Sequence, residues 1–394
     1  MEFESPAIVA ILLAAAGFTG WYVGRRAQRA ARRQARRRLP ADYFAGLNFL
    51  INEQPDRAVE VFTRMVDVDK ETVEIHFALG SLFRRRGEVD RAIRVHQNIL
   101  DRPKLDPEQR ELALLELAID YLRAGLLDHS ERLFQALLES ETYRVTALRS
   151  LTRIYEQQRD WQQAIATHRQ LEASGGEAPS SAIAHYYCEL AEAARVQGNI
   201  DEARAHLRSA RRERRRFSRS AMVRAELASA AGEFVLASRL LRIALKRSPV
   251  LIFEVLPRLQ KVCERLGNDE PLEAVIATWN RDRKRQTELA QALILTDVLK
   301  TPTALAAVRE YILGDSILQE LLQPLISNAE LPPETWRRMA RVLARVLGRG
   351  PRYQCRECGF GSQTWFWQCP GCKAWDSMHP HVTPTAAPAP GAGY

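Results

Sequence analysis

A small residue recurs at nearly regular intervals through the middle of the chain, and this recurrence limits the fold more than any other feature. It occupies six positions, separated by steps of 34, 38, 34, 39 and 34 residues: Ala58, Ala92, Ser130, Ala164, Ala203 and Ala237. One helical hairpin cannot bury its own apolar face, whereas stacked hairpins build a continuous core, and small residues let the paired helices approach closely. The spacing therefore predicts an all-α superhelix of stacked hairpins.

Turn residues precede each recurrence, including Gly87, Gly125, Arg159-Asp160, Gly198 and Gly232. This combination resembles the tetratricopeptide repeat, and the resemblance covers residues 40–250 well. It departs from the family pattern where two of the steps carry insertions of four or five residues. After Pro249 the register is blurred, but the helical pattern continues, so we expect the repeat array to fill residues 39–348.

Two CxxC pairs near the C-terminus have the spacing of a metal site. Cys355 and Cys358 form the first pair, and ten residues separate it from Cys369 and Cys372. Four thiolates fill a tetrahedral shell and leave no vertex for water, which predicts a closed, structural site for one metal ion. Such a site suits zinc or a single iron, and the spacing does not decide between them.

The metal ligands lie in a short module, expected over residues 349–380. Gly359, and the pair Pro370-Gly371, are expected to supply the turns of its two metal-binding knuckles. Six aromatic residues are expected to form its small core, although a base-stacking surface is an alternative: Tyr353, Phe360, Trp365, Phe366, Trp367 and Trp375. His379 and His381 are expected to be bystanders, and the Pro/Ala/Gly-rich residues 381–394 to be disordered.

Residues 5–24 carry no charge and are long enough to cross a bilayer as a helix. Glu2 and Glu4 precede them and eight arginines within residues 25–38 follow, which is the reverse of the order in a cleaved signal peptide. The positive-inside rule places these arginines, and the body of the chain, in the cytoplasm. We therefore expect a single-pass membrane anchor at residues 1–24 and a basic arm at residues 25–38 that adheres to anionic inner-membrane lipids.

The net charge of +9 is concentrated at the N-terminus, because the first 38 residues account for six of the nine charges. The nearly neutral remainder gives no reason to expect a nucleic-acid partner. One basic stretch lies at residues 208–219. It is interpreted either as a solvated helix end, whose cations suit the helix dipole, or as a contact for acidic partners or the membrane surface.

No phosphate-binding loop, dinucleotide fingerprint, HExxH helix or nucleophile elbow occurs in the sequence. We predict no catalytic residues and no cofactor-binding residues beyond the metal ligands. Cys188 and Cys263 are given no role, and His76, His96 and His168 fall at packing positions of the repeat helices. The architecture is typical of a binding protein rather than an enzyme.

The order of anchor, repeats and terminal module resembles the lipopolysaccharide assembly protein B family of Gram-negative bacteria. The motif Y-x-C-x-x-C-G-F…W-x-C-P-x-C-x-x-W is similar to that family's rubredoxin-like domain. The resemblance implies an inner-membrane adaptor that presents the deacetylase of the lipid A pathway to the ATP-dependent membrane protease FtsH, restrained by another inner-membrane regulator. It assigns residues only for the metal ligands.

Two alternative functions remain open at this point. The chain could be a general scaffold for membrane-associated lipopolysaccharide assembly complexes, or an iron-based electron carrier. The identity of the metal, the docking surfaces for client and protease, and homo-oligomerisation are also left open by the sequence.

Overall fold

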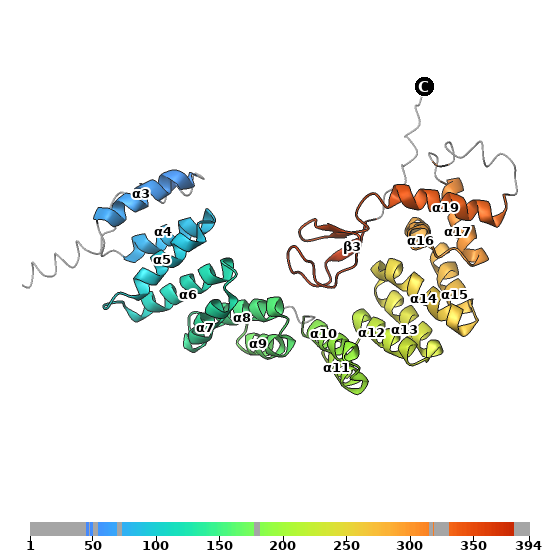
Figure 1. Ribbon diagram of the computed structural model, residues 1–394, viewed down its shortest axis with the longest axis horizontal. Helices are drawn as coiled ribbons and strands as arrows, with labels where there is room; N and C mark the ends of the chain where they lie inside the picture. The colour runs from blue at the N-terminus through green and yellow to red at the C-terminus, as the bar shows by residue number, and fades with distance from the viewer. Residues whose placement is uncertain are drawn as a thin grey trace, which may run out of the picture. The chain divides into compact units, whose positions relative to one another are not determined.

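The computed structural model describes residues 45–46, 48–49, 54–68, 73–176, 182–314, 318 and 331–381 (Figure 1). The expected membrane anchor at residues 1–24, the basic arm at residues 25–38 and residues 382–394 of the expected tail lie outside these residues. Among the residues that are described, no helix is both long and apolar enough to cross a membrane.

The chain divides into two compact units, Met1–Ile154 and Tyr155–Tyr394. The first unit is helical throughout its described part, and α8 continues across the boundary. Its elements are α3 (Pro55–Val68), α4 (Val73–Arg85), α5 (Val89–Leu100), α6 (Pro107–Arg123), α7 (Leu127–Ala136), the short 3-10 helix η1 (Leu137–Glu139) and α8 (Arg144–Gln158).

The second unit contains a further series of helices and then a small sheet. Its helices are α9 (Trp161–Ala173), α10 (Ala182–Val196), α11 (Ile200–Glu213), α12 (Ser218–Ala230), α13 (Phe234–Arg247), η2 (Pro249–Leu251), α14 (Ile252–Leu266), α15 (Glu270–Asn280), α16 (Arg283–Leu295), α17 (Pro302–Gly314) and α19 (Pro333–Leu347). Its strands are β1 (Tyr353–Cys355), β2 (Gly361–Ser362) and β3 (Met378–Pro380).

Neighbouring helices pair as the recurrence predicts, with α4 on α5, α6 on α7, α10 on α11 and α12 on α13. All six recurring small residues lie on α3, α5, α7, α9, α11 and α13, and each has a relative exposure of 0%. Space is also short where a glycine faces the partner helix, because a Cβ on Gly80 of α4 would lie 2.4 Å from the His96 ring of α5. The repeat fold is therefore confirmed, and its register is the predicted one.

The predicted turn residues adopt left-handed backbone conformations. Gly125 has φ of 76° and Gly198 has φ of 84°, values that glycine adopts without a steric penalty. Arg159 takes the same region with φ of 58°, although it carries a side chain. Asp160 then accepts a hydrogen bond from the backbone N–H of Gln163 at 3.1 Å and so caps α9.

A buried polar network joins α4, α5 and α6 in the first unit. The Asp120 carboxylate has no exposed surface; it lies 2.5 Å from Nδ1 of His96 and accepts a hydrogen bond from Arg84 at 2.7 Å. Arg84 also contacts Glu116 of α6. The three helices are thereby held by charge-assisted hydrogen bonds as well as by apolar packing.

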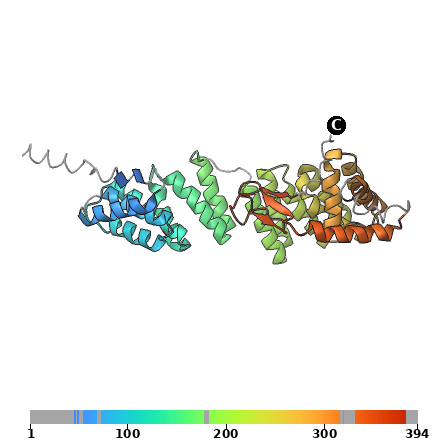
Figure 2. The same ribbon diagram turned by 90° about the horizontal axis from the view of Figure 1, so that it is seen from above.

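The three strands form an antiparallel sheet in the order β2-β1-β3. Tyr353 lies opposite Ser362 on one side and Pro380 on the other. Buried residues of the sheet region join the same hydrophobic cluster as residues of the repeat helices: Tyr353, Cys355, Cys369 and Met378. Within the second unit the module therefore packs against the curved row of helices, as both views show (Figures 1 and 2).

Substitution of Gly80 by alanine tests the close approach of α4 and α5. Alanine favours a helix over glycine by about 1 kcal/mol, but the added Cβ would overlap the His96 ring, and overpacking costs about 1–3 kcal/mol. We expect a net loss of stability, measured as a lower midpoint in thermal unfolding. Gly350→Ala is the control, because nothing lies within 4 Å of the point that a Cβ on Gly350 would occupy. An unchanged midpoint for Gly80→Ala would show that the cost of overpacking does not exceed the gain in helix propensity.

Candidate metal centre and its contacts with the repeats

The sulfurs of Cys355, Cys358, Cys369 and Cys372 all lie within 4.8 Å of one another. Cys355 and Cys372 are 3.7 Å apart, as are Cys358 and Cys369, and none of the four forms a disulfide. A tetrahedron with metal–sulfur bonds of about 2.3 Å has edges of about 3.8 Å. The spacing of the thiols therefore fits a single four-coordinate metal ion.

Each CxxC pair forms a turn that aims backbone N–H groups at its first sulfur. The N–H groups of Glu357 and Cys358 donate toward Cys355, and those of Gly371 and Cys372 donate toward Cys369. Gly359 has φ of 75°, as expected for the first turn. In the second turn the left-handed residue is Lys373, with φ of 62°, and not Gly371. Pro370 and Gly371 lie in the second turn, as expected, but the residue after the second cysteine is the one that takes this conformation in both turns.

These donors help the thiols to ionise. Burial alone would raise the pKa of Cys355, but hydrogen bonds with Ser377 and with the backbone of Cys358 and Glu357 outweigh it and lower this pKa to about 6. Burial raises the pKa of Cys369. A cation among four thiolates would remove their mutual repulsion and displace the remaining protons.

Trp375 joins the module to the repeat helices. Its ring stacks on His185 of α10, with centroids 4.4 Å apart, and makes an edge-to-face contact with the ring of Trp161 of α9. Its indole N–H donates to Glu156 at 2.9 Å, across 219 residues of sequence. Glu156 also accepts a 2.7 Å hydrogen bond from the hydroxyl of Tyr186. One carboxylate at the end of α8 thus binds both a repeat helix and the module.

Asp376 makes the second polar contact. One carboxylate oxygen lies 3.1 Å from Nε2 of His185, and the other accepts a hydrogen bond from Arg214 at 2.9 Å. Burial would raise the pKa of Asp376, but His185 and Arg214 outweigh it and lower this pKa. Burial lowers the pKa of His185. A neutral His185 can direct Nε2–H toward Asp376 while Nδ1 faces Arg219.

Arg219 of α12 is buried beneath the module, with 2% of its side chain exposed. It donates to Glu189 at 2.8 Å and to Glu192 at 3.2 Å, both on α10. Its guanidinium lies 5.5 Å from the ring centre of Trp367 and 5.8 Å from that of Trp375. Burial alone would lower the pKa of Arg219, but the two carboxylates outweigh it and raise this pKa, so the side chain stays charged.

Tyr353 anchors the opposite edge of the module. It is fully buried, its hydroxyl donates to Glu254 of α14, and its ring meets Phe253 edge-on with centroids 6.1 Å apart. The expectation that all six aromatics form a core within the module was therefore too simple. Tyr353 and Trp375 pack on the repeats, whereas Phe360 and Phe366 are exposed.

The sequence did not identify Glu156, His185, Arg219 or Asp376 as functional residues. Its one available signal was the polar spacing of His185, Glu189 and Glu192, which share a face of the largely apolar α10. His76, His96 and His168 lie at packing positions of the repeat helices, as expected, and all three are buried. His379 and His381 lie outside the set of clustered thiols found among the described residues.

This fold and site define a class of protein: a tetratricopeptide-repeat array with a four-cysteine metal-binding module at its C-terminal end. A model of the rubredoxin metal binding domain matches residues 353–380, and tetratricopeptide-repeat models match residues 75–111, 147–177 and 188–251. Lipopolysaccharide assembly protein B of Escherichia coli K12 is 33% identical over 383 residues, which cover 94% of this chain and 97% of that protein. The chain belongs to the lipopolysaccharide assembly protein B family.

A second relative of the same name, from Haemophilus influenzae, is 27% identical over 396 residues, with coverage of 94% and 97%. Among solved structures, the C-terminal part of a tetratricopeptide-repeat protein from Cytophaga hutchinsonii aligns at 12% identity and a TM-score of 0.38. That alignment covers 73% of this chain and 100% of the other. At this score the likeness supports no conclusion.

Substitution of Cys369 by serine should remove the metal and unfold the module. Metal binding supplies about 10–16 kcal/mol to small sites of this kind, and the module's own apolar core is too small to replace that contribution. Elemental analysis of the purified full chain should give one metal ion per wild-type molecule and none for the variant. Cys263→Ser, a buried cysteine far from the thiol cluster in sequence, is the control and should keep the metal.

Substitution of Asp376 by asparagine should weaken the attachment of the module to α10. The change removes the charge opposite Arg214, and hydrogen bonds to charged groups contribute about 1.5–3 kcal/mol. Amide hydrogen exchange within residues 353–380 measures the opening of the module, and about 1.4 kcal/mol corresponds to tenfold faster exchange. Glu357→Gln, on an exposed part of the module, should exchange at the wild-type rate. Equal rates for all three proteins would show that Asp376 does not contribute to the attachment.

Proposed function

We propose that this chain is a non-enzymatic inner-membrane adaptor that regulates lipopolysaccharide synthesis by presenting the lipid A pathway deacetylase to the membrane protease FtsH. Similarity over nearly the whole length to proteins named lipopolysaccharide assembly protein B is the observation that carries this proposal. Tetratricopeptide repeats support it, because stacked helical hairpins offer extended surfaces for other proteins.

The expected anchor gives the adaptor its mechanism. A helix at residues 5–24 would confine the chain to the plane of the membrane, where a captured client meets a membrane protease at high effective concentration. The arginines of residues 25–38 would hold the repeats at the cytoplasmic face. In this arrangement the anchor raises the rate of delivery without any new contact between client and protease.

The metal centre has a structural role in this proposal. Cys355, Cys358, Cys369 and Cys372 would hold zinc, as favoured by the zinc-ribbon name of the matched family model, and leave no open coordination position. The bound ion would fix the two turns of the module, and so the position of Trp375 and Asp376 against the repeats. The metal would thereby stabilise the adaptor without taking part in chemistry.

An iron-based electron carrier is the second candidate, because Cys358 and Cys372 are exposed and an outer partner could approach the site closely. Visible absorption of the purified chain distinguishes the two. A colourless zinc protein excludes electron transfer, whereas a coloured, reversibly reducible iron protein excludes the purely structural role.

The half-life of the deacetylase tests the adaptor proposal. We expect deletion of residues 1–24, and separately Cys369→Ser, to lengthen it toward the value in cells that lack the chain, as followed by pulse-chase. Cys263→Ser should leave it unchanged. A general scaffold for assembly complexes predicts the same half-life with and without the chain, and that result would exclude the adaptor role.

A further inference from the structure

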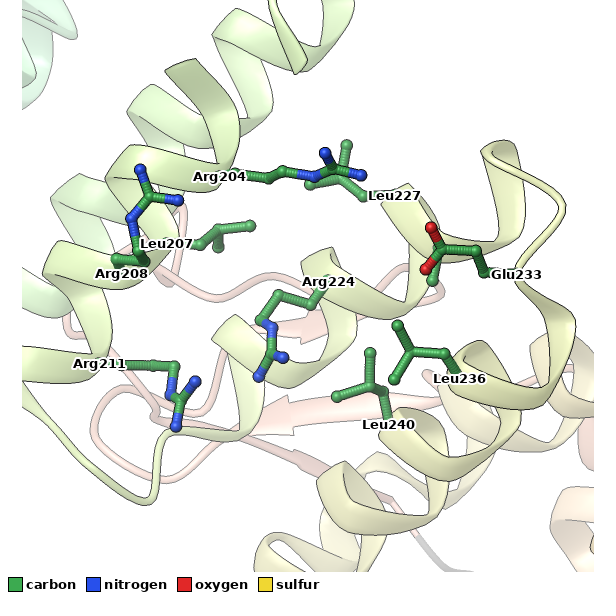
Figure 3. A pocket seen from close by; sticks show the side chains of 10 residues that line it. Arg204, Leu207, Arg208, Arg211, Arg224, Leu227, Glu233, Leu236 and Leu240 are labelled. Carbon is green, nitrogen blue, oxygen red and sulfur yellow. The ribbon is translucent and has the colours of Figure 1, made fainter. Parts of the chain in front are cut away.

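A basic hollow opens between α11, α12 and α13, on residues that the metal module does not use (Figure 3). It encloses about 230 Å³. We call it the α11–α13 pocket, and its lining residues are Arg204, Leu207, Arg208, Arg211, Arg224, Leu227, Ala228, Glu233, Leu236 and Leu240. Figure 3 shows three of the arginines along α11, Arg224 in the centre, and Leu236 and Leu240 on the opposite wall.

The arginines of this pocket outnumber Glu233, the carboxylate among its lining residues, by four to one. Within the described part of the chain Arg208, Arg211 and Arg224 make no ion pair, and Arg204 only approaches the exposed Asp201 at 3.8 Å. Arg224 is half-buried, and burial together with Arg211 and Arg247 lowers its pKa. Unpaired cations that repel one another are unfavourable in the free protein and would be stabilised by an anionic ligand.

The floor of the pocket is apolar. Leu207, Leu227 and Leu240 are buried there, while Leu236 and the neighbouring Val235 are 39% and 72% exposed. A ligand that fills this hollow therefore needs apolar groups as well as negative charge. An inorganic anion satisfies only the arginines.

Two further cavities lie against α13 and share lining residues in sequence with this one. A second cavity of about 480 Å³ shares Glu233 and Leu236 with the first. A third, of about 590 Å³, shares Arg239 with the second and extends to Trp279 and Arg285. Arginines and apolar side chains thus line all three cavities, from α11 to α16, and Glu233 lies where the first two meet. A lipid headgroup would fill one of them, whereas an extended peptide can occupy all three.

The geometry points to a docking groove for an extended segment of a partner protein in which acidic and apolar residues are mixed. Guanidinium groups bind carboxylates in bidentate geometry, and the leucines accept the apolar side chains between them. This inference deepens the proposed function and rests on it only for the partner's identity, because it gives the chemistry by which an adaptor would hold a client. The basic stretch at residues 208–219 thus divides, with Arg208 and Arg211 facing the groove and Arg219 facing the module.

Fluorescence anisotropy with the full chain in neutral-lipid nanodiscs tests this inference. The probe is a labelled synthetic peptide of mixed glutamate and leucine, and its partner peptide has glutamine in place of glutamate. We expect the acidic peptide to bind, and Arg208→Glu with Arg224→Glu to weaken binding at least tenfold. Two single charge reversals at exposed arginines form a matched pair. Arg208→Glu lies inside the groove and should weaken binding, whereas its control, Arg338→Glu on α19, lies outside the groove and should not. Equal thermal midpoints exclude loss of folding, and the single change should still weaken binding if the double variant does not fold.

Three results would overturn the inference. The acidic peptide could fail to bind the wild-type chain, it could bind Arg338→Glu and Arg208→Glu equally weakly, or the groove variants could lose binding to phosphatidylglycerol vesicles instead of to peptide. The half-life of the deacetylase distinguishes failure of the groove inference from failure of the adaptor proposal. If the half-life depends on the chain while the peptide does not bind, the groove is wrong and the adaptor stands. If the peptide binds in a groove-dependent way while the half-life is independent of the chain, the groove stands and the deacetylase is not its partner.

Discussion

The burial of Arg219 is the constraint on which the second unit depends. A guanidinium without access to water is tolerated only when carboxylates neutralise it, and Glu189 and Glu192 do so from α10. Trp367 and Trp375 cover the remaining face, and both belong to the metal module. The guanidinium of Arg219 is therefore shielded from water only while the module is folded and attached, whereas Glu189 and Glu192 stay partly exposed.

This arrangement couples a metal ion to helices that are distant in sequence. The thiolates would set the two turns of the module, the turns place Trp375 and Asp376, and these residues contact α8, α9 and α10. The opposite edge is held by Tyr353 on Glu254 of α14. Because both edges are attached, the module braces helices on either side of it, and its small sheet acts as a structural element of the repeat array rather than as a separate appendage.

Features set by local spacing could be predicted from the sequence, and features set by long-range contacts could not. The register of Ala92, Ala164 and Ala237 follows from helical packing within one hairpin, so the sequence contains the whole argument for their burial. The grouping of four cysteines likewise follows from two short turns. By contrast, the indole N–H of Trp375 and the carboxylate of Glu156 are separated by 219 residues, and no local pattern indicates that they meet. The aromatic residues of the module were assigned to its own core for the same reason.

The two faces of α12 explain why a recognition groove can lie next to a structural metal site. Arg219 and Arg224 are five residues apart, which at about 100° per residue turns them to different sides of the helix. Arg219 holds α12 against α10 and the module, whereas Arg224 lines the pocket between α11 and α13. The walls of the groove are then held at a constant separation by a helix that the module has already fixed, so binding a segment there requires little further ordering of the protein. The metal would contribute to recognition by stabilising the helix between the two walls, without contact with the ligand.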